Sequence, residues 1–324
     1  MTATLIALDW GTSSLRAYRM GAAGRVLESR RLSWGIMHLP PAPGGTADAD
    51  PAQGFDRAFE AACGDWLRDE PGLPVIACGM VGSAQGWREA AYLDLPTRLD
   101  GLAAQLVRVP RGDAAPLHIV PGLIARGTLP NVMRGEETQV AGVLAGLPPA
   151  RAGGDVLIGL PGTHSKWVDV RAGEVRHFDT FMTGEVYAVL RGHTILGRTM
   201  QEAGPPDEAA FARGLDVAGS QAGRLGVLST IFSCRTLGLT GELGARAQAD
   251  YLSGLLVGHE VAALAASLAG GGRTPNIVLC GETALCDRYA LALERNGLGR
   301  PARVHGATER GLWQLAVASG LAAA

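Results

Sequence analysis

The chain has 324 residues, long enough for two domains with substantial cores. Hydrophobic residues make up 47% and charged residues 19%, which excludes a disordered or low-complexity class. The formal net charge of −2 gives no electrostatic footprint for nucleic acid or an anionic membrane. We therefore expect small molecules as partners.

The sequence predicts a cytoplasmic protein. The first apolar run begins at Leu5 without a basic flank and is cut by Asp9, unlike a secretory signal peptide. The most apolar later stretch, residues 251–268, contains His259 and Glu260 and so predicts a buried helix, not a membrane span. Five cysteines occur without a CxxC pair, which indicates reduced core residues.

The first candidate site lies in residues 5–18. A short apolar run ends on Asp9, turns through Gly11, Thr12 and Ser13, and continues as an alternating strand, which predicts a β-hairpin. Small residues let a backbone approach phosphate closely, and a carboxylate can hold Mg²⁺ directly or through its waters. The tip therefore suits the phosphates of a nucleotide, although an ordinary hairpin turn explains the same pattern.

A second copy of this pattern begins about half the chain later, where GTSS at residues 11–14 returns as GTHS at residues 162–165. The spacing predicts two related domains, 1–128 and 129–324, with a boundary in residues 121–130. The second copy has Leu160 in the place of Asp9, so one turn can anchor metal while the other only binds phosphate. The phosphate-binding residues expected in the second copy are Gly162, Thr163, His164, Ser165 and Lys166. A solvated surface position is the plain alternative for His164 and Lys166.

A glycine-rich loop follows the strand predicted for residues 74–78. Loops that leave the carboxyl ends of parallel strands are where α/β folds bind ligands. Trp87 could stack on an apolar substrate face while Gln85 and Arg88 bond its oxygens, and Gly82 and Ser83 belong to the same candidate substrate site. A plain packing role is the alternative, because such loops with one aromatic residue are common.

Two adjacent carboxylates open a helix predicted from residue 133 to about residue 145. Acidic residues in a first turn suit the helix dipole, so Glu136 and Glu137 could be no more than good helix design. They are also well placed to take a proton from an attacking hydroxyl. Neighbours on a helix diverge by about 100°, so only one of them can easily face a site, and the sequence leaves open which.

The remaining elements follow from periodicity and capping signals. We expect strands at 25–32, 117–120, 276–280 and 302–305, and helices from a capping sequence at 50–53 to about 67, at 98–107, after 282 to about 295, and at 308–321. Residues 207–268 are expected to be almost entirely helical, with a core face that includes Leu225, Leu228 and Phe232. Gly281 and Glu282, between a strand and a helix start, could admit an adenine ring.

These motifs together resemble the superfamily of acetate kinase, sugar kinases, heat-shock chaperones and actin. Residues 9–16, 161–166 and 279–285 match its phosphate-1, phosphate-2 and adenosine regions. Within it, the chain resembles the 2-dehydro-3-deoxygalactonokinase family. The motifs that carry the resemblance are LDWGTSSLRAY at 8–18, GMVGS at 79–83 with Gly86 and Trp87, MRGEETQ at 133–139, LPGTHSKW at 160–167, FMTGE at 181–185 and DYLSGLL at 250–256.

The resemblance implies an α/β fold of two actin-like, ribonuclease-H-like domains that close on ATP and Mg²⁺ in an interdomain cleft, with a nucleotide-side second domain and a sugar-acid-side first domain. It also implies transfer of the γ-phosphoryl group of ATP to the C6 hydroxyl of 2-dehydro-3-deoxygalactonate, in galactonate breakdown. In this scheme Asp9 would hold Mg²⁺, and Thr12, Ser13, Thr163 and Ser165 would bind phosphate oxygens. Arg16 or Lys166 would offset developing charge, and Arg88 or Arg134 would bind the acid group.

The resemblance leaves the proton acceptor open. Larger sugar kinases usually carry an Asp where this chain has Glu136 or Glu137, and Asp9 could instead orient the nucleophile through metal-bound water. Alternative functions are a kinase for a related acid such as 2-dehydro-3-deoxygluconate, an ATPase or phosphohydrolase on the same fold, and a sugar-sensing regulator. A regulator would normally carry a helix-turn-helix segment and a basic surface, and neither is apparent. A homodimer is the default expectation.

Overall fold

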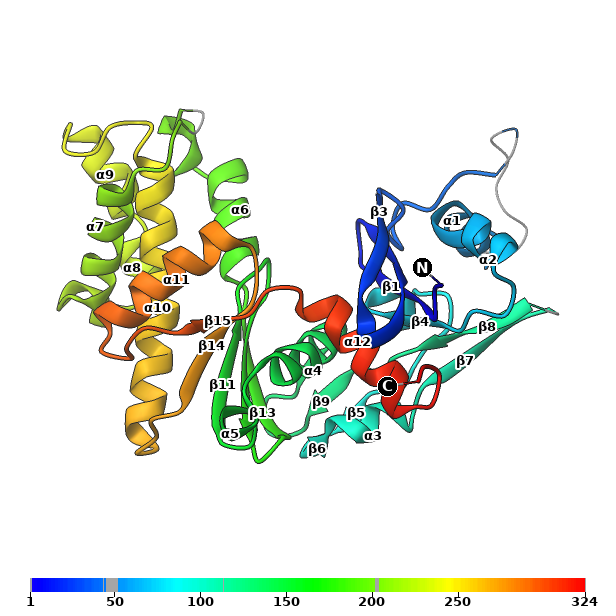
Figure 1. The fold of residues 1–324 in the computed structure, drawn as a ribbon. Coiled ribbons are helices and arrows are strands. Elements are labelled where there is room, and N and C mark those ends of the chain that lie inside the picture. The colour runs from blue at the N-terminus through cyan, green and yellow to red at the C-terminus, as the bar shows by residue number, and fades with distance from the viewer. Residues whose placement is uncertain (1, 43, 45–51, 113, 202–203, 324) are drawn as a thin grey trace. The chain divides into compact units, whose positions relative to one another are not determined.

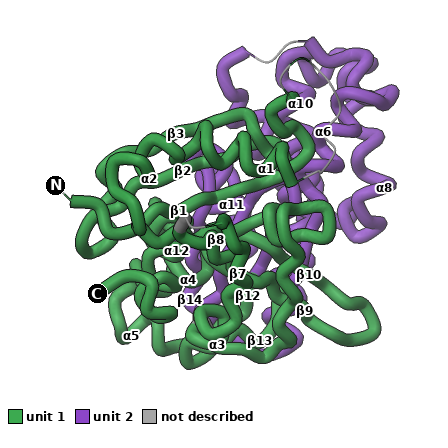
Figure 2. The backbone as a smooth tube through the Cα atoms, turned by 90° about the vertical axis from the view of Figure 1, so that its right-hand side faces the viewer, with its two compact units in different colours: residues 1–155, 168–178, 304–324 green, residues 156–167, 179–303 purple. Residues whose placement is uncertain are grey.

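The computed structural model describes residues 2–42, 44, 52–112, 114–201 and 204–323 (Figure 1). The chain forms two compact units (Figure 2). The first comprises residues 1–155, 168–178 and 304–324, and the second comprises residues 156–167 and 179–303. The boundary between actin-like domains that we expect at residues 128 and 129 stays a prediction.

A six-stranded sheet forms the core of the first unit. It runs in the order β3-β2-β1-β4-β8-β7, with β1 (Leu5–Trp10), β2 (Leu15–Met20), β3 (Val26–Leu32), β4 (Val75–Cys78), β7 (Val107–Arg111) and β8 (Ala114–Ile119). The first three strands pair antiparallel, whereas β1, β4 and β8 are parallel. β1 is buried along almost its whole length, which explains its continuous apolar sequence before Asp9. The predicted hairpin and the strands at 25–32 and 74–78 are confirmed.

A similar strand order recurs in a second six-stranded sheet, five strands of which lie in residues 155–303. The order β15-β14-β11-β12-β13-β6 joins β11 (Asp155–Leu160), β12 (Ser165–Arg171), β13 (Glu174–Phe181), β14 (Asn276–Leu279), β15 (Ala302–Arg303) and β6 (Thr97–Arg98). β11 pairs in parallel with β14 and β14 with β15, as β1 does with β4 and β4 with β8. β11 thus takes the place of β1 in its sheet. This repeat confirms the predicted α/β class with two ribonuclease-H-like sheets.

The first unit also contains a small three-stranded sheet and a short helix. The sheet joins β5 (Leu93–Asp94), β9 (Leu123–Ala125) and β10 (Asn131–Met133) in the order β10-β9-β5. The helix expected at 98–107 is wrong in extent, because α3 covers only Leu99–Ala103. Val107 and Val109 instead pair with β8 opposite Ile119 and Leu117. Their sheet pairing and burial override the weak helical pattern.

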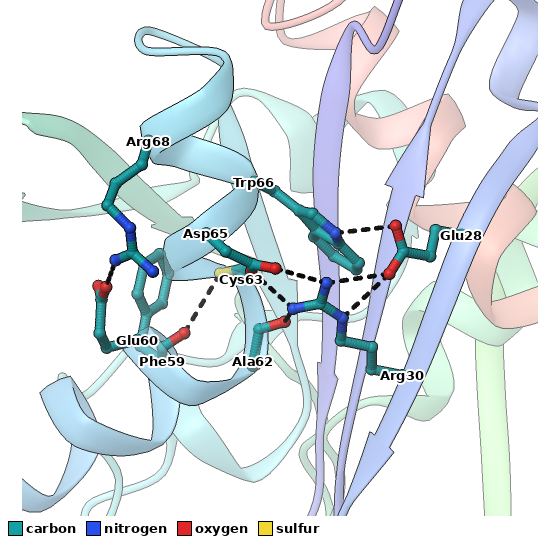
Figure 3. A network of polar contacts seen from close by, with 9 residues as sticks. All are labelled: Glu28, Arg30, Phe59, Glu60, Ala62, Cys63, Asp65, Trp66 and Arg68. Carbon is teal, nitrogen blue, oxygen red and sulfur yellow. Dashed lines mark hydrogen bonds and ion pairs between the residues drawn. The ribbon is translucent and has the colours of Figure 1, made fainter. Parts of the chain in front are cut away.

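Two helices cover one face of the first sheet. α1 (Ala52–Phe59) continues through a π-helical turn at Glu60–Gly64 into α2 (Asp65–Asp69), while the capping residues expected at 50 and 51 lie outside the described residues. Arg30 on β3 joins these helices to the sheet, since its guanidinium donates to Asp65 at 2.6 and 2.7 Å and to Glu28 at 2.9 Å (Figure 3). The Trp66 indole donates to Glu28 at 3.0 Å (Figure 3).

Two helices cross closely beside this sheet. α4 spans Glu136–Gly146 and α12 spans Ala307–Ala318, both near their predicted positions, and the short helix α5 (Pro149–Ala152) follows α4. The crossing depends on glycine, because a Cβ atom on Gly142 would lie 1.8 Å from the Ala307 carbonyl oxygen and one on Gly311 would lie 1.9 Å from that of Thr138. This contact holds the first turn of α4 in place.

The second unit is mostly helical around its sheet. Its helices are α6 (Thr183–His193), α7 (Glu208–Gly219), α8 (Val227–Thr230), α9 (Ser233–Leu239), α10 (Gln248–Gly270) and α11 (Thr283–Arg295). α10 is long and apolar enough to cross a membrane, but 61% of its most apolar window is buried in the structure. Gly214 and Gly254 let α7 and α10 touch backbone to backbone. α10 is therefore packed as the buried helix predicted for residues 251–268.

Part of the core predicted for residues 207–268 is wrong. Leu225 is 76% exposed, Leu228 85% and Phe232 52%. Gly226, with φ of +88°, separates a 3₁₀ turn from α8, which has only four residues. The helical period is broken there, so apolar residues that would share one face of a continuous helix point to solvent instead.

Candidate active site

The turn after β1 places Asp9 beside a row of hydroxyl groups. The amide of Gly11 donates to the Ser14 carbonyl at 2.9 Å, and the side chains of Thr12 and Ser13 are exposed. A neighbouring segment supports the turn, because the amide of Ile36 donates to the Gly11 carbonyl at 3.1 Å. The turn therefore presents its hydroxyl groups outward from a fixed backbone.

The carboxylate of Asp9 is influenced by burial and by one charged side chain of each sign. Burial raises the pKa of Asp9, the Arg16 guanidinium lowers it, and the carboxylate of Glu309 raises it further. Arg16 Nη1 lies 3.4 Å from Asp9 Oδ2. Glu309 stands in the first turn of α12. Its proximity to Asp9 could not be read from the sequence, because the two residues are 300 positions apart.

Two glycine-rich loops meet next to Asp9. Asp9 lies opposite Cys78 at the carboxyl end of β4, and Gly79 begins the following loop with φ of +92°. Gly135, with φ of +106°, precedes α4. A Cβ atom on Gly135 would lie 3.3 Å from Cα of Gly79, so the two loops touch by backbone. The loops containing residues 79–88 and 133–137 are thus brought together, as the sequence predicts for one site.

The two candidate bases differ in burial. Glu137 is fully buried, and its carboxylate accepts hydrogen bonds from the Gly135 amide at 2.6 Å and the Thr138 hydroxyl at 3.0 Å. Burial, followed by the charge of Glu136, raises the pKa of Glu137 to about 8. Glu136 is partly exposed, and its carboxylate accepts from the Arg134 amide at 3.0 Å. Glu136 is therefore the more accessible carboxylate.

The candidate substrate residues on the loop after β4 have different surroundings. Gln85 and Arg88 are exposed, whereas Ser83 and Arg134 are buried. Trp87 packs its ring against an aromatic cluster at centroid distances of 5.9 Å from Trp10, 6.0 Å from Phe55 and 5.8 Å from Phe59. The packing alternative for Trp87 thus has direct structural support, and its substrate contact stays a prediction.

In the second unit, the turn after β11 is fixed by the start of α6. The amide of Glu185 donates to the Thr163 carbonyl at 3.0 Å, and the carboxylate of Glu185 contacts the His164 ring. Lys166 is buried, with Nζ donating to the Thr180 hydroxyl at 2.7 Å. Thr163 and His164 are exposed, whereas Ser165 is buried. Lys166 is therefore held by contacts inside the protein.

A cavity of about 300 Å³ lies beside this turn, within the second unit. Its lining comes from the turn, α6, α10 and the start of α11, and consists of Gly162, Thr183, Gly184, Tyr187, Ser253, Leu256, Val257, Glu282, Ala284, Leu285, Arg288 and Tyr289. Glu282 caps α11 by accepting from the amides of Ala284 and Leu285 at 3.1 and 2.9 Å. Gly281 packs against Pro161. The segment between β14 and α11, which contains Gly281 and Glu282, thus borders the cavity next to the predicted phosphate-2 turn.

A buried carboxylate connects the walls of this cavity, and no sequence motif pointed to it. Glu260 is 3% exposed and accepts hydrogen bonds from Trp167 Nε1 at 2.8 Å and the Tyr289 hydroxyl at 2.7 Å. The Thr183 hydroxyl also donates to it. Burial raises the pKa of Glu260, and these donors lower it. The one sequence signal for Glu260 is its position as a carboxylate inside an apolar helix.

Comparisons with known proteins agree with this geometry. The model of the 2-keto-3-deoxy-galactonokinase family matches residues 9–315. A probable 2-dehydro-3-deoxygalactonokinase from Rhizobium meliloti is 38% identical over 298 residues, which cover 90% of this chain and 89% of the relative. The 2-dehydro-3-deoxygalactonokinase of Escherichia coli is 34% identical over 305 residues, with 92% and 91% covered.

A solved structure shares the fold. It is a crystal structure of a Sinorhizobium meliloti protein described as a candidate 2-dehydro-3-deoxygalactonokinase, with a TM-score of 0.83 and 34% identity. The alignment covers 97% of this chain and 98% of that one. Sequence relatives, family model and structure agree over nearly the whole length. The chain therefore belongs to the 2-keto-3-deoxy-galactonokinase family.

Proposed function

We propose that this protein transfers the γ-phosphoryl group of ATP to the C6 hydroxyl of 2-dehydro-3-deoxygalactonate, as a step of galactonate breakdown. One observation carries the proposal within this kinase family. The two Gly-Thr-x-Ser turns follow β1 and β11, which hold equivalent places in two sheets that share the order of five strands. Turns built from small residues can bind phosphate through their backbone amides. Two such turns could therefore contact the phosphates of one nucleotide.

ATP is the phosphoryl donor in this proposal. The adenosine would occupy the cavity lined by α6, α10 and α11, and the phosphates would meet the turn from Gly162 to Lys166. The described residues contain no group of three or more His, Cys, Asp or Glu side chains able to hold a metal ion. Mg²⁺ fits Asp9 nonetheless, because Mg²⁺ keeps several waters and needs only one or two carboxylates, and the negative charge of Glu309 also acts on Asp9. Bound there, Mg²⁺ would neutralise charge on the phosphates.

The protein residues supply positioning and proton transfer. Thr12, Ser13 and Thr163 would hold phosphate oxygens, and Arg16 would offset developing charge. Glu136, the more exposed carboxylate of its pair, would accept the proton of the attacking hydroxyl. Glu137 would instead fix the Gly135 turn, since both of its oxygens are already bonded inside the protein. Ser165 and Lys166, both buried, would act after rearrangement of the turn.

A coupled ADP-release assay over a panel of 3-deoxy-2-oxo acids tests the proposal. We expect turnover with the galactonate-derived acid, and at most slow ADP release without an acceptor. Asp9→Asn should lower kcat by about 100-fold or more while the fold is kept. Full turnover of Asp9→Asn would contradict the metal-binding role of Asp9. ADP release independent of any acid would favour an ATPase. A higher kcat/KM for the gluconate-derived acid would reassign the substrate.

We also propose a cytoplasmic location and a homodimeric state for this protein. Four of the five cysteines, Cys63, Cys78, Cys234 and Cys286, are buried as thiols, which suits the cytoplasm. A homodimer would cover the exposed apolar side chains of Leu225, Leu228 and Phe232. Light scattering should then give twice the chain mass, and Leu228→Lys should reduce it to the mass of one chain. A monomeric wild-type protein would overturn the dimer.

A further inference from the structure

Arg134 is a buried cation in the first unit, and none of the described residues gives it an anionic partner. Its residue is 9% exposed, and its guanidinium carbon lies 4.3 Å from the centre of the Tyr92 ring. Nη2 donates to the Ala90 carbonyl at 2.7 Å, while Nε and Nη1 are buried and have no hydrogen-bond partner within the part of the chain that the structure describes. Among the described residues, no carboxylate contacts this guanidinium. The neighbouring Glu136 bonds the backbone amide of Arg134 instead.

A buried guanidinium with unpaired N–H groups lowers the stability of the fold unless an anion binds to it. A buried, unpaired charge or donor loses its hydration without compensation. The aromatic ring offsets part of this loss, but it cannot accept the in-plane N–H groups. Nη1 and the second N–H of Nη2 form one planar edge, and this edge matches the two oxygens of a carboxylate. The missing partner is therefore a planar anion.

Ser83, the next residue after Gly82, holds a second buried donor that has no partner in the described part of the chain. Its residue is 7% exposed, and its hydroxyl oxygen is buried without a partner. The preceding residue, Gly82, lies directly against Arg134, because a Cβ atom there would be 3.0 Å from Nη1. Glycine at position 82 thus avoids a side chain that would crowd the guanidinium. Gly82 and Ser83 follow β4, and Arg134 precedes Gly135, which touches Gly79.

We infer that Arg134 and Ser83 form the subsite that binds the carboxylate of the phosphoryl acceptor, so that the enzyme selects acids over neutral sugars. The inference rests on the proposed function and assigns the acid-binding role to Arg134 instead of the exposed Arg88. The subsite is joined to Asp9 through the touching loops of Gly79 and Gly135. One end of the acceptor would therefore be held by charge while its far hydroxyl meets the phosphoryl group.

The test compares Arg134→Gln with the wild type on the 3-deoxy-2-oxo acid and on its primary amide, which lacks the negative charge. For Arg134→Gln we expect KM for the acid to rise on the order of 100-fold, KM for ATP to stay unchanged, and the preference for acid over amide to vanish. Ser83→Ala should raise KM for the acid by about 10-fold. Arg134→Lys keeps the charge without the planar edge and should fall between Gln and wild type.

Arg111→Gln is the matched control. Arg111 also lies over an aromatic ring, 3.8 Å from the centre of Phe59, with Nε and Nη1 buried and unpartnered. It pairs with Ala114 at the start of β8, whereas Ile119 at the end of β8 lies near Gly82. We expect Arg111→Gln to keep the wild-type KM for the acid. An unchanged acid preference in Arg134→Gln, or an equal loss in Arg111→Gln, would overturn the inference.

Calorimetric titration of the acid separates this inference from the proposed function. If the wild type binds the acid but does not phosphorylate it, the proposed function fails while the subsite can still be measured. Binding lost in Arg134→Gln and kept in Arg111→Gln supports the subsite in either case, and equal binding in both overturns it. If Arg134→Gln does not fold, the affinity of Arg134→Lys and Ser83→Ala for the acid tests the subsite. Wild-type affinity in both variants would overturn the inference.

Discussion

The hydroxyl of Tyr289 on α11 donates a hydrogen bond to the buried carboxylate of Glu260 on α10 across 2.7 Å. The same hydroxyl lies 2.8 Å from Ser165 Oγ, at the end of the predicted phosphate-2 turn. Through Glu260 the turn is also joined to Thr183, at the start of α6. Walls of the candidate nucleotide cavity from α6 and α11 are therefore held by one carboxylate with three donors.

Replacement of Glu260 by Gln should damage both stability and nucleotide binding. An amide has a single acceptor oxygen and two N–H groups, so at least one of the three donors loses its partner. We expect the free energy of unfolding to fall by about 2–4 kcal/mol and KM for ATP to rise. Urea unfolding and initial rates measure the two effects.

Tyr289→Phe is the companion variant for Glu260. It removes one donor and leaves the carboxylate bonded to Trp167 and Thr183, so its effect on stability should be about 1 kcal/mol. A Glu260→Gln protein with wild-type KM for ATP would show that the network only stabilises the fold. Equal losses in the two variants would contradict the central place of Glu260.

Gly184 is required for the contact between α6 and the phosphate-2 turn. A Cβ atom at this position would lie 2.4 Å from the Gly162 carbonyl oxygen and 2.8 Å from Cα of Thr163. Gly184→Ala should displace the turn and raise KM for ATP by about 10-fold or more. Gly192→Ala in the same helix is the matched control, because nothing lies within 4 Å of its Cβ position. It should keep KM and add up to about 1 kcal/mol of stability through helix propensity.

The ring of Trp87 should contribute mainly to packing. It stacks on Phe55 with an interplanar angle of 14° and meets Trp10 and Phe59 edge to face. Trp87→Ala should lower the free energy of unfolding by about 3 kcal/mol, whereas Trp87→Phe should cost less than about 1.5 kcal/mol. Denaturant unfolding of both variants measures this. A change in KM for the acid in Trp87→Phe, with stability kept, would support the substrate contact that the sequence suggests.

The elements that the sequence predicts well are those with local signals. The β1 hairpin and its repeat combine apolar runs with Gly-Thr turns, and α4 begins with an acidic first turn, so short-range patterns suffice. The proximity of Glu309 to Asp9 and the bonds of Glu260 depend on residues far apart in sequence. No periodicity reports them. The exposure of Leu228 was missed for a related reason, because a helix interrupted at Gly226 has no continuous face.

Glu137 gives the free energy of unfolding a pH dependence with a definite sign. Burial and the charge of Glu136 raise its pKa in the folded protein to about 8, from an ordinary value of 4.5. Hydrogen bonds from Gly135 and Thr138 act in the opposite direction, and the buried Cys78 thiol also feels its charge. Between pH 4.5 and 8 the folded protein keeps a proton that the unfolded chain has lost. Stability must therefore fall as the pH rises through this window, by at most about 1.4 kcal/mol per pH unit from this group.

Glu137→Gln removes this titration and measures it. The difference in free energy of unfolding, wild type minus Glu137→Gln, should decrease steadily from about pH 5 to pH 8 and become constant above pH 9. Glu136→Gln keeps the titrating group but removes the neighbouring charge, so the decrease should end at a lower pH. Urea titrations at unit pH steps give these differences. A difference that stays constant, or that grows with pH, would mean that Glu137 is ionised in the folded protein and free to act as the base in place of Glu136.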